Sequence, residues 1–262
     1  MAKFGAKEVM DVIFYDIATN KPVLFLDTLK TSAVETTAQE VYARGGQGNS
    51  KLIGWEFDKE ISMSMQDALL APKSIELVTG VATKIGVQAI SMRQDTEFDV
   101  TDPANPVDKG SYFPLKASGT GAIQLAYTPL ESAANIWVYE KAEDGMAGKE
   151  KVGTLSGTVL TVAGLANKEV VVYYSYNSKA TAETYTVSAD KFGGTYKIVG
   201  DTYLRNDTTG VDEKFQMVIP KAKLKSGFNL NFSSDGEPSV FDLNVEVLKD
   251  SKTPTMITMV KY

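Results

Sequence analysis

The sequence predicts a mainly β protein, an antiparallel β-sandwich or barrel with one short flanking helix. Apolar and polar residues alternate along several stretches, which is the pattern of half-buried strands. Clusters of Gly, Pro, Asn and Asp separate these stretches and predict turns between the strands. Residues 66–80 carry the signals of a helix instead.

The N-terminal half contains one strong strand pattern and several shorter ones. The strong pattern begins at Trp55, where apolar residues alternate with acidic and hydroxyl-bearing ones. Its apolar members are Trp55, Phe57, Ile61, Met63 and Met65. We therefore expect these side chains to share one buried face, on which Lys59 is the single exception. Shorter strands are expected at residues 9–17, 23–28, 86–93, 123–127 and 136–140.

The helix is expected directly after this strong strand, at residues 66–80. Pro72 is tolerated in a first helical turn because its missing N–H group would have no intrahelical partner there. Gly80 stands where many helices end in a left-handed glycine. The two residues together predict one short helix.

The C-terminal third predicts three successive strands. Its alternating apolar residues are Phe215, Met217 and Ile219, then Phe228, Leu230 and Phe232, then Phe241, Leu243, Val245 and Val247. Residues 233–239 contain Asp235 and Gly236, which suit a turn with positive backbone angles. We therefore expect a meander whose second and third strands are antiparallel neighbours.

The domain organisation expected from these patterns is one β domain with an insertion. Residues 1–132 and 181–262 would form the domain, and residues 133–180 a possible small β insertion. Within the insertion, residues 159–162 and 170–176 are expected to pair as a hairpin, because the second run is β-branched and aromatic. No linker composition marks the borders of the insertion.

Composition argues against most enzymatic chemistry. The 262 residues include no histidine and no cysteine. Their absence excludes cysteine nucleophiles, Ser-His-Asp triads, iron-sulfur clusters and zinc sites built on those side chains. We expect no enzyme, and we assign no catalytic residue, no cofactor and no metal ligand. The net charge of -6 argues against binding nucleic acid through a basic surface, and no segment approaches the roughly 20 apolar residues of a membrane span.

A glycine-rich segment is the first candidate site. It consists of Arg44, Gly45, Gly46, Gly48, Asn49 and Lys51. Adjacent backbone amides in such a segment can bind an anion, but its spacing matches neither phosphate-loop motif, and a strand follows where either motif needs a helix. We therefore interpret it as a flexible or subunit-contacting loop.

Two further clusters have both a functional and a structural interpretation. Asp99, Asp102, Asn105 and Asp108 could offer oxygen ligands to calcium, although they lack the residue order of an EF-hand, and a turn-rich loop explains them as well. Tyr173, Tyr174 and Tyr176 could stack on sugars or bases, or could pack in a core or an interface.

Two segments in this order resemble a tailed-bacteriophage major tail tube protein. They are residues 44–80, with the glycine-rich loop, the strong strand and the helix, and residues 215–250, with the C-terminal strands. The resemblance implies a tail-tube-type β-sandwich whose copies form hexameric rings, stacked into a conduit for DNA. It also implies that a long loop, which we assign to residues 31–51, bridges successive rings.

The same resemblance predicts partners and location. The partners would be further copies of the chain, other tail proteins such as the tape measure, terminator and baseplate, and DNA that passes through the lumen without specific binding. The protein would be made in the host bacterial cytoplasm and reside in the virion tail. Two alternatives remain open, namely a capsid decoration or other virion β-protein and, from another class, a carbohydrate-binding β-sandwich that uses Tyr173, Tyr174 and Tyr176.

Overall fold

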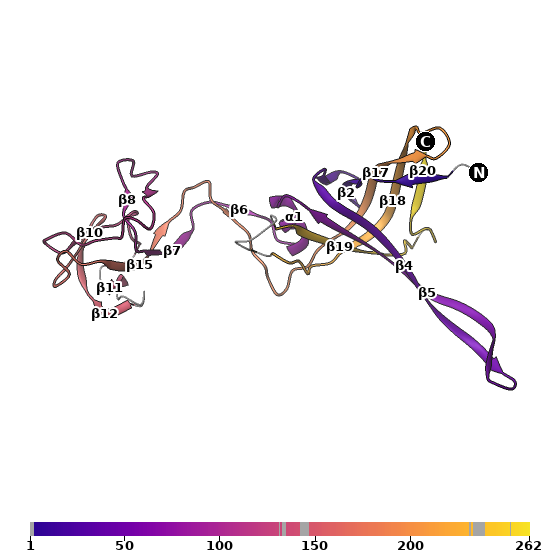
Figure 1. Ribbon diagram of the computed structural model, residues 1–262, viewed down its shortest axis with the longest axis horizontal. Helices are drawn as coiled ribbons and strands as arrows, with labels where there is room; N and C mark the ends of the chain where they lie inside the picture. The colour runs from indigo at the N-terminus through magenta and orange to yellow at the C-terminus, as the bar shows by residue number, and fades with distance from the viewer. Residues whose placement is uncertain are drawn as a thin grey trace. The chain divides into compact units, whose positions relative to one another are not determined.

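The computed structural model of the protein describes residues 3–130, 132, 135–141, 147–230, 232, 239–251 and 253–262. The chain separates into two compact units (Figure 1). The first comprises Met1–Thr83 and Tyr185–Tyr262, and the second comprises Lys84–Thr184. Residues 133–180, expected as an insertion, lie wholly inside the second unit, which begins earlier, at Lys84.

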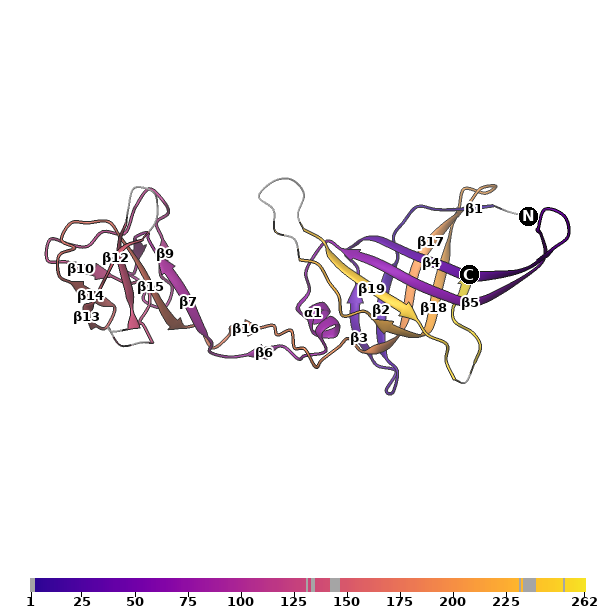
Figure 2. The ribbon, with the colours of Figure 1, turned by 90° about the horizontal axis from the view of Figure 1, so that it is seen from below.

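Antiparallel strands dominate both units, which confirms the predicted fold class. The first unit contains a nine-stranded sheet (Figure 2). Its main path runs in the order β3 (Pro22–Leu26), β2 (Asp11–Asp16), β17 (Thr195–Asn206), β18 (Asp212–Leu224), β19 (Phe241–Val247), β5 (Ser50–Asp67) and β4 (Leu29–Gly45). Two short strands join this path: β1 (Phe4–Ala6) pairs with β17, and β20 (Thr258–Lys261) pairs with β18.

The core of the first unit lies between this sheet and the single α-helix of the described residues. Ile61, Met63 and Met65 of β5 are buried in it, as the alternation predicts. The helix contributes Ile75, Leu77 and Val78 to the same core. At about 25 cal/mol per Å² of apolar surface, this burial is the main favourable contribution to folding.

Helix α1 (Pro72–Thr79) is shorter than the predicted helix at residues 66–80. Its end is as expected: Gly80 has φ +68°, and its N–H group donates to the carbonyl oxygen of Glu76 at 2.9 Å. Its start is later than predicted because β5 continues to Asp67, whose buried carboxylate accepts from the Thr28 hydroxyl and the Leu69 N–H group. At eight residues the helix is too short to cross a membrane, and the described part contains no other α-helix.

The predicted C-terminal meander is correct only in part. The first and third runs form β18 and β19, but Phe228 and Leu230 belong to no strand. Strand β19 pairs with β18 and β5, so both its edges are occupied and the second run has no place beside it. Phe228 packs against Phe241 instead, with 5.6 Å between ring centroids. Of the turn expected at residues 233–239, only Ser239 is described.

The second unit is a small sandwich of two antiparallel sheets around its own core. One sheet has the order β12 (Ala147–Lys151), β11 (Trp137–Lys141), β15 (Val170–Asn177) and β7 (Ala89–Gln94). The other has the order β10 (Ala122–Gln124), β14 (Val159–Val162) and β13 (Gly153–Ser156). Two short pairs complete the unit: β8 (Phe98–Asp99) with β9 (Val107–Asp108), and β6 (Lys84–Ile85) with β16 (Glu183–Thr184).

The hairpin predicted from residues 159–162 and 170–176 is wrong. These residues form β14 and β15, which belong to different sheets. Val162 and Val170 are both fully buried in the core between the sheets. Strand β15 already pairs with β11 on one edge and β7 on the other, so neither edge accepts β14.

A glycine comparison tests the close packing at the end of α1. A Cβ atom at Gly80 would lie 2.3 Å from the Phe192 carbonyl oxygen, whereas one at Gly210, with a similar φ of +66°, would meet nothing within 4 Å. Left-handed backbone alone costs roughly 1–2 kcal/mol in alanine. We expect Gly210→Ala to lower the free energy of unfolding by that amount, and Gly80→Ala by clearly more, in urea denaturation followed by circular dichroism. Equal losses would show that the approach of Phe192 does not constrain the helix end.

Candidate assembly interface

The most distinctive feature of the first unit is the long β4–β5 hairpin. Strand β19 pairs with β5 only from Ser62 to Asp67, so the outer part of the hairpin is held by the pairing of its own two strands. We call residues 37–60 the arm. Figure 1 shows the arm extending away from the rest of the first unit's sheet.

One extra residue in β5 changes which side chains face which way along the arm. Asp58 has a left-handed backbone with φ +53°. Because Thr37 pairs with Glu60 and Gln39 with Phe57, two residues of β5, Asp58 and Lys59, lie opposite one residue of β4. This is a β-bulge. A shift of one residue moves all following side chains to the opposite face of the strand.

The bulge places an apolar stripe on the surface of the arm. The stripe consists of Val41, Ile53, Trp55 and Phe57, which are 52%, 56%, 52% and 50% exposed. Cross-strand pairs Val41–Trp55 and Gln39–Phe57 put these residues on the face opposite to that of Ile61, Met63 and Met65. The prediction that Trp55 and Phe57 share the buried face is therefore wrong. The interruption at Lys59 was the only sequence signal of the change.

The opposite face of the arm is polar and well packed. The ring of Tyr42 lies against Gly54, where a Cβ atom would be only 2.9 Å from the ring. The Lys51 Nζ atom lies 3.6 Å from the centroid of the same ring, and the Tyr42 hydroxyl donates to Glu40. These contacts stabilise the two-stranded arm beyond its backbone pairing.

The structure brings the predicted glycine-rich residues together at the tip of the arm. Arg44 and Gly45 end β4, Ser50 and Lys51 begin β5, and residues 46–49 form the turn. Gly46, Gly48 and Asn49 have φ values of +77°, +85° and +50°, which explains the residue types. Strand β5 follows the turn, as the sequence indicated. The role of these residues in assembly stays a prediction.

Residues 31–51, expected to be a long loop, are mostly strand. Strand β4 runs from Leu29 to Gly45 without a break in its own backbone. Most of β4 lies at the surface and has no buried face. Polar residues therefore occur on both of its faces, and the sequence lacks the apolar–polar alternation that identifies a half-buried strand. Threonine and valine at several of its positions nevertheless favour extended backbone.

The sheet of the first unit has open ends. β3 pairs only with β2 and β4 only with β5 among the described residues. An end strand presents unpaired backbone groups, which can pair with a strand of another chain. The end strand β4 is also one of the two strands of the arm. The arm therefore carries both the apolar stripe and an unpaired strand edge.

The acidic loop of the second unit forms local turns. Asp99 accepts from the backbone and hydroxyl of Thr101, and Asp102 accepts from Asn105 and the Ala104 N–H group. These hydrogen bonds lower the pKa of both carboxyl groups. Asp108 accepts hydrogen bonds from the Thr96 hydroxyl and the Gly110 N–H group. The described residues contain no group of three or more acidic, His or Cys residues that could hold a metal ion.

The three tyrosines proposed as a sugar platform do not share one surface. Tyr174 is buried, its hydroxyl donates to Gln94 Oε1 at 3.0 Å, and burial raises its pKa to about 12. Tyr176 stacks on Tyr127, with 3.9 Å between ring centroids. Tyr173 lies on the other face of β15, because side chains alternate along a strand. A platform of these three residues is therefore ruled out.

The bulge at Asp58 gives a local test of the arm. Valine rarely adopts a left-handed backbone, whereas glycine does so freely. We expect Asp58→Val to destabilise the arm by roughly 1–2 kcal/mol, which would accelerate amide hydrogen exchange in residues 37–45 about tenfold. Asp58→Gly should leave exchange nearly unchanged. Equal exchange rates in the two variants would show that the arm does not depend on the positive φ angle.

Comparison with known proteins identifies a family. No curated protein matches the chain closely enough to be reported. The family model described as the YomU/Tube protein family matches residues 4–261, and the match therefore includes the first unit, the arm and the second unit. The chain belongs to the YomU/Tube protein family.

Proposed function

We propose that this protein is the tube subunit of a bacteriophage tail, with a structural and not an enzymatic role. Copies of the chain assemble into hexameric rings, the rings stack, and DNA passes through the resulting tube. The family description, which names a tube, supports this proposal. We further propose that the protein resides in the virion tail and is made in the host bacterial cytoplasm.

The observation that carries the proposal is the arm with its apolar stripe. Exposed apolar patches of this kind mark interaction surfaces. Burying the exposed half of each of the four side chains would contribute roughly 1 kcal/mol per residue. The stripe lies on a projecting hairpin, so it can reach a second subunit. We assign the arm, including the predicted contact residues at its tip, to contacts between successive rings.

The open ends of the sheet supply a second contact, within a ring. β3 and β4 end the same sheet, so one end of a subunit can meet the other end of its neighbour. Repeated head-to-tail contacts form a closed ring when the rotation that relates one subunit to the next is a whole-number fraction of 360°. Closure would also satisfy edge groups that otherwise favour uncontrolled aggregation.

One sheet face carries several carboxylates, although Lys223 lies directly opposite Glu246 on it. Asp242 and Glu246 of β19 and Glu35 of β4 lie on the face opposite to the core residues of those strands. Repulsion between such carboxylates and phosphates keeps DNA from binding to the wall. We propose that this face borders the lumen, and that the tape measure, terminator and baseplate proteins are the further partners.

Assembly of the purified chain tests the proposal. We expect rings or tubes in negative-stain microscopy at high protein concentration. A glutamate in the stripe, Trp55→Glu, should abolish stacking because a buried unpaired charge is costly. The matched control is Ala38→Glu, which adds the same charge on the opposite face of the arm and should assemble normally. Circular dichroism and urea denaturation would verify that both variants fold.

Two results would count against this assignment. One is a strictly monomeric wild-type chain at all concentrations and with tail partners present. The other is stacking that survives Trp55→Glu, which would show that the stripe is not the contact between rings. Co-sedimentation with empty heads but not with isolated tails would favour a capsid decoration protein instead.

A further inference from the structure

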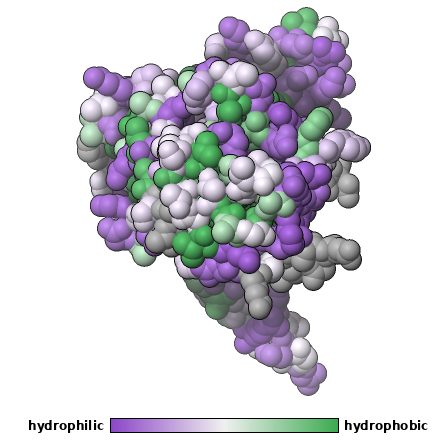
Figure 3. Space-filling model, turned by 90° about the vertical axis from the view of Figure 1, so that its left-hand side faces the viewer, coloured by the Kyte–Doolittle hydropathy of each residue, from purple (hydrophilic) through white to green (hydrophobic). Residues whose placement is uncertain are grey.

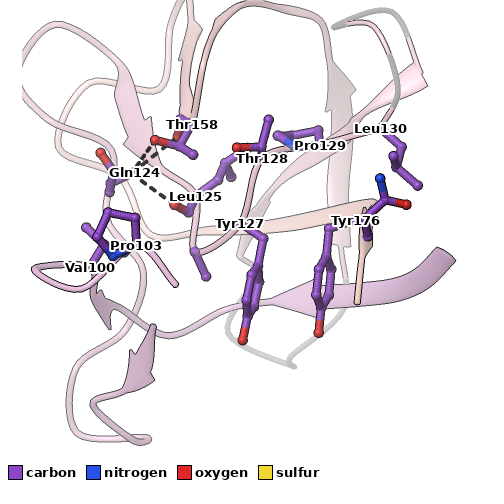
Figure 4. A pocket seen from close by; sticks show the side chains of 12 residues that line it. Val100, Pro103, Gln124, Leu125, Tyr127, Thr128, Pro129, Leu130, Thr158 and Tyr176 are labelled. Carbon is purple, nitrogen blue, oxygen red and sulfur yellow. Dashed lines mark hydrogen bonds between the residues drawn. The ribbon is translucent and has the colours of Figure 1, made fainter. Parts of the chain in front are cut away.

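The second unit contains a pocket to which the proposed tube function assigns no role. Its volume is about 470 Å³, within the range of small-molecule sites. One wall is the segment 124–130, and other walls come from the β8–β9 loop, from Thr158 and from the end of β15 (Figure 4). Among the residues that the structure describes, those lining the pocket carry no charge.

A buried hydrogen-bond network fixes the pocket wall. Gln94 is 1% exposed, and its Oε1 atom accepts from the Ala126 N–H group and from the Tyr174 hydroxyl, both at 3.0 Å. Its Nε2 atom donates to the Gln124 carbonyl oxygen at 3.2 Å. The Tyr174 hydroxyl in turn accepts from the Tyr127 N–H group at 3.3 Å. The wall is therefore already formed without a ligand.

The loop between β8 and β9 is held at the pocket by polar contacts. Asn105 donates to the Asp102 carboxylate at 2.7 Å, and this turn contains Pro103. Lys179, which follows β15, donates to the side-chain oxygen of Asn105. These contacts position Val100 and Pro103 as the apolar part of the lining.

The lining combines an aromatic pair with neutral polar groups. Tyr127 and Tyr176 stack in parallel with an interplanar angle of 6° (Figure 4). Both rings line the pocket while they also pack against the core of the second unit. Gln124 Nε2 donates to the Leu125 carbonyl oxygen at 2.9 Å and to Thr158 Oγ1 at 3.0 Å. The hydrogen bonds of this side chain to described residues all use its Nε2 atom, so its Oε1 atom can accept one from a ligand.

These features select the ligand by its chemistry. A charged ligand would lose hydration without meeting an opposite charge. A sugar ring has an apolar face that can stack on tyrosine and hydroxyl groups that can bond to the amides of Gln124 and Asn177. A pocket of this volume accommodates one or two such rings. We propose that this pocket binds a neutral saccharide.

Saturation-transfer NMR on the full chain tests the proposal. The probes are N-acetylglucosamine, maltose and cellobiose, with sialyllactose as a charged comparison and pentaproline as a peptide comparison. We expect saturation transfer to at least one neutral sugar and to neither comparison ligand. Gln124→Ala and Asn177→Ala should each weaken that binding about three- to tenfold, the usual effect of losing one hydrogen bond.

Trp137→Ala is the matched control, because Trp137 is a half-exposed aromatic residue on the outer face of the same unit's four-stranded sheet. It should leave sugar binding unchanged. The proposal is overturned by no transfer from any neutral sugar at about 10 mM, far above the dissociation constant of a millimolar site. It is also overturned if Trp137→Ala removes sugar binding while Gln124→Ala and Asn177→Ala do not. Stronger saturation transfer to sialyllactose or pentaproline than to the neutral sugars would overturn it as well. Tube formation by the same variants is a separate readout.

Discussion

Side chains on a β-strand alternate between two faces, and a single extra residue reverses that alternation. In β5 this residue lies at the bulge of Asp58 and Lys59. On one side of the bulge, Met63 and Met65 are buried in the core of the first unit. On the other side, Trp55 and Phe57 reach solvent from the opposite face. One strand thus supplies both the core and the exposed apolar stripe.

The second unit depends on a different constraint, a buried amide. Gln94 lies in an apolar core, where an unsatisfied polar group costs about 1–3 kcal/mol. Its hydrogen bonds to Ala126, Gln124 and Tyr174 meet that requirement and fix the segment that lines the pocket. The two units have separate cores that share no residue, so each can carry its own function.

The sequence predicted what depends on local pattern. The strand positions around Met63, Phe215 and Leu243 follow from alternation, and the helix end follows from Gly80. Strand pairing could not be predicted from the local pattern. For example, β14 and β15 follow each other in the chain yet belong to different sheets. The borders of the second unit were also hidden, since no change in composition marks Lys84 or Thr184.

The candidate site was predicted only in part, for a physical reason. The glycine-rich tip was identified because left-handed backbone restricts the residue type at Gly46 and Gly48. The apolar stripe was missed because exposed and buried strand faces show the same alternation. In the sequence, only Lys59 interrupts the alternation at the bulge. A single polar residue on an apolar strand face is common, so it does not by itself show that the side chains change faces.

The polar face of the arm restricts how the proposed assembly can form. Glu40 and Glu56 lie directly opposite each other across β4 and β5, and like charges in such a pair repel. Burying this face against an acidic neighbour would increase that repulsion as water is removed. Among the cross-strand pairs that the structure describes in the arm, none on the face with Trp55 joins two like charges. An arm with one apolar and one polar face favours docking through the apolar face, which would favour an ordered stack of rings over random aggregation.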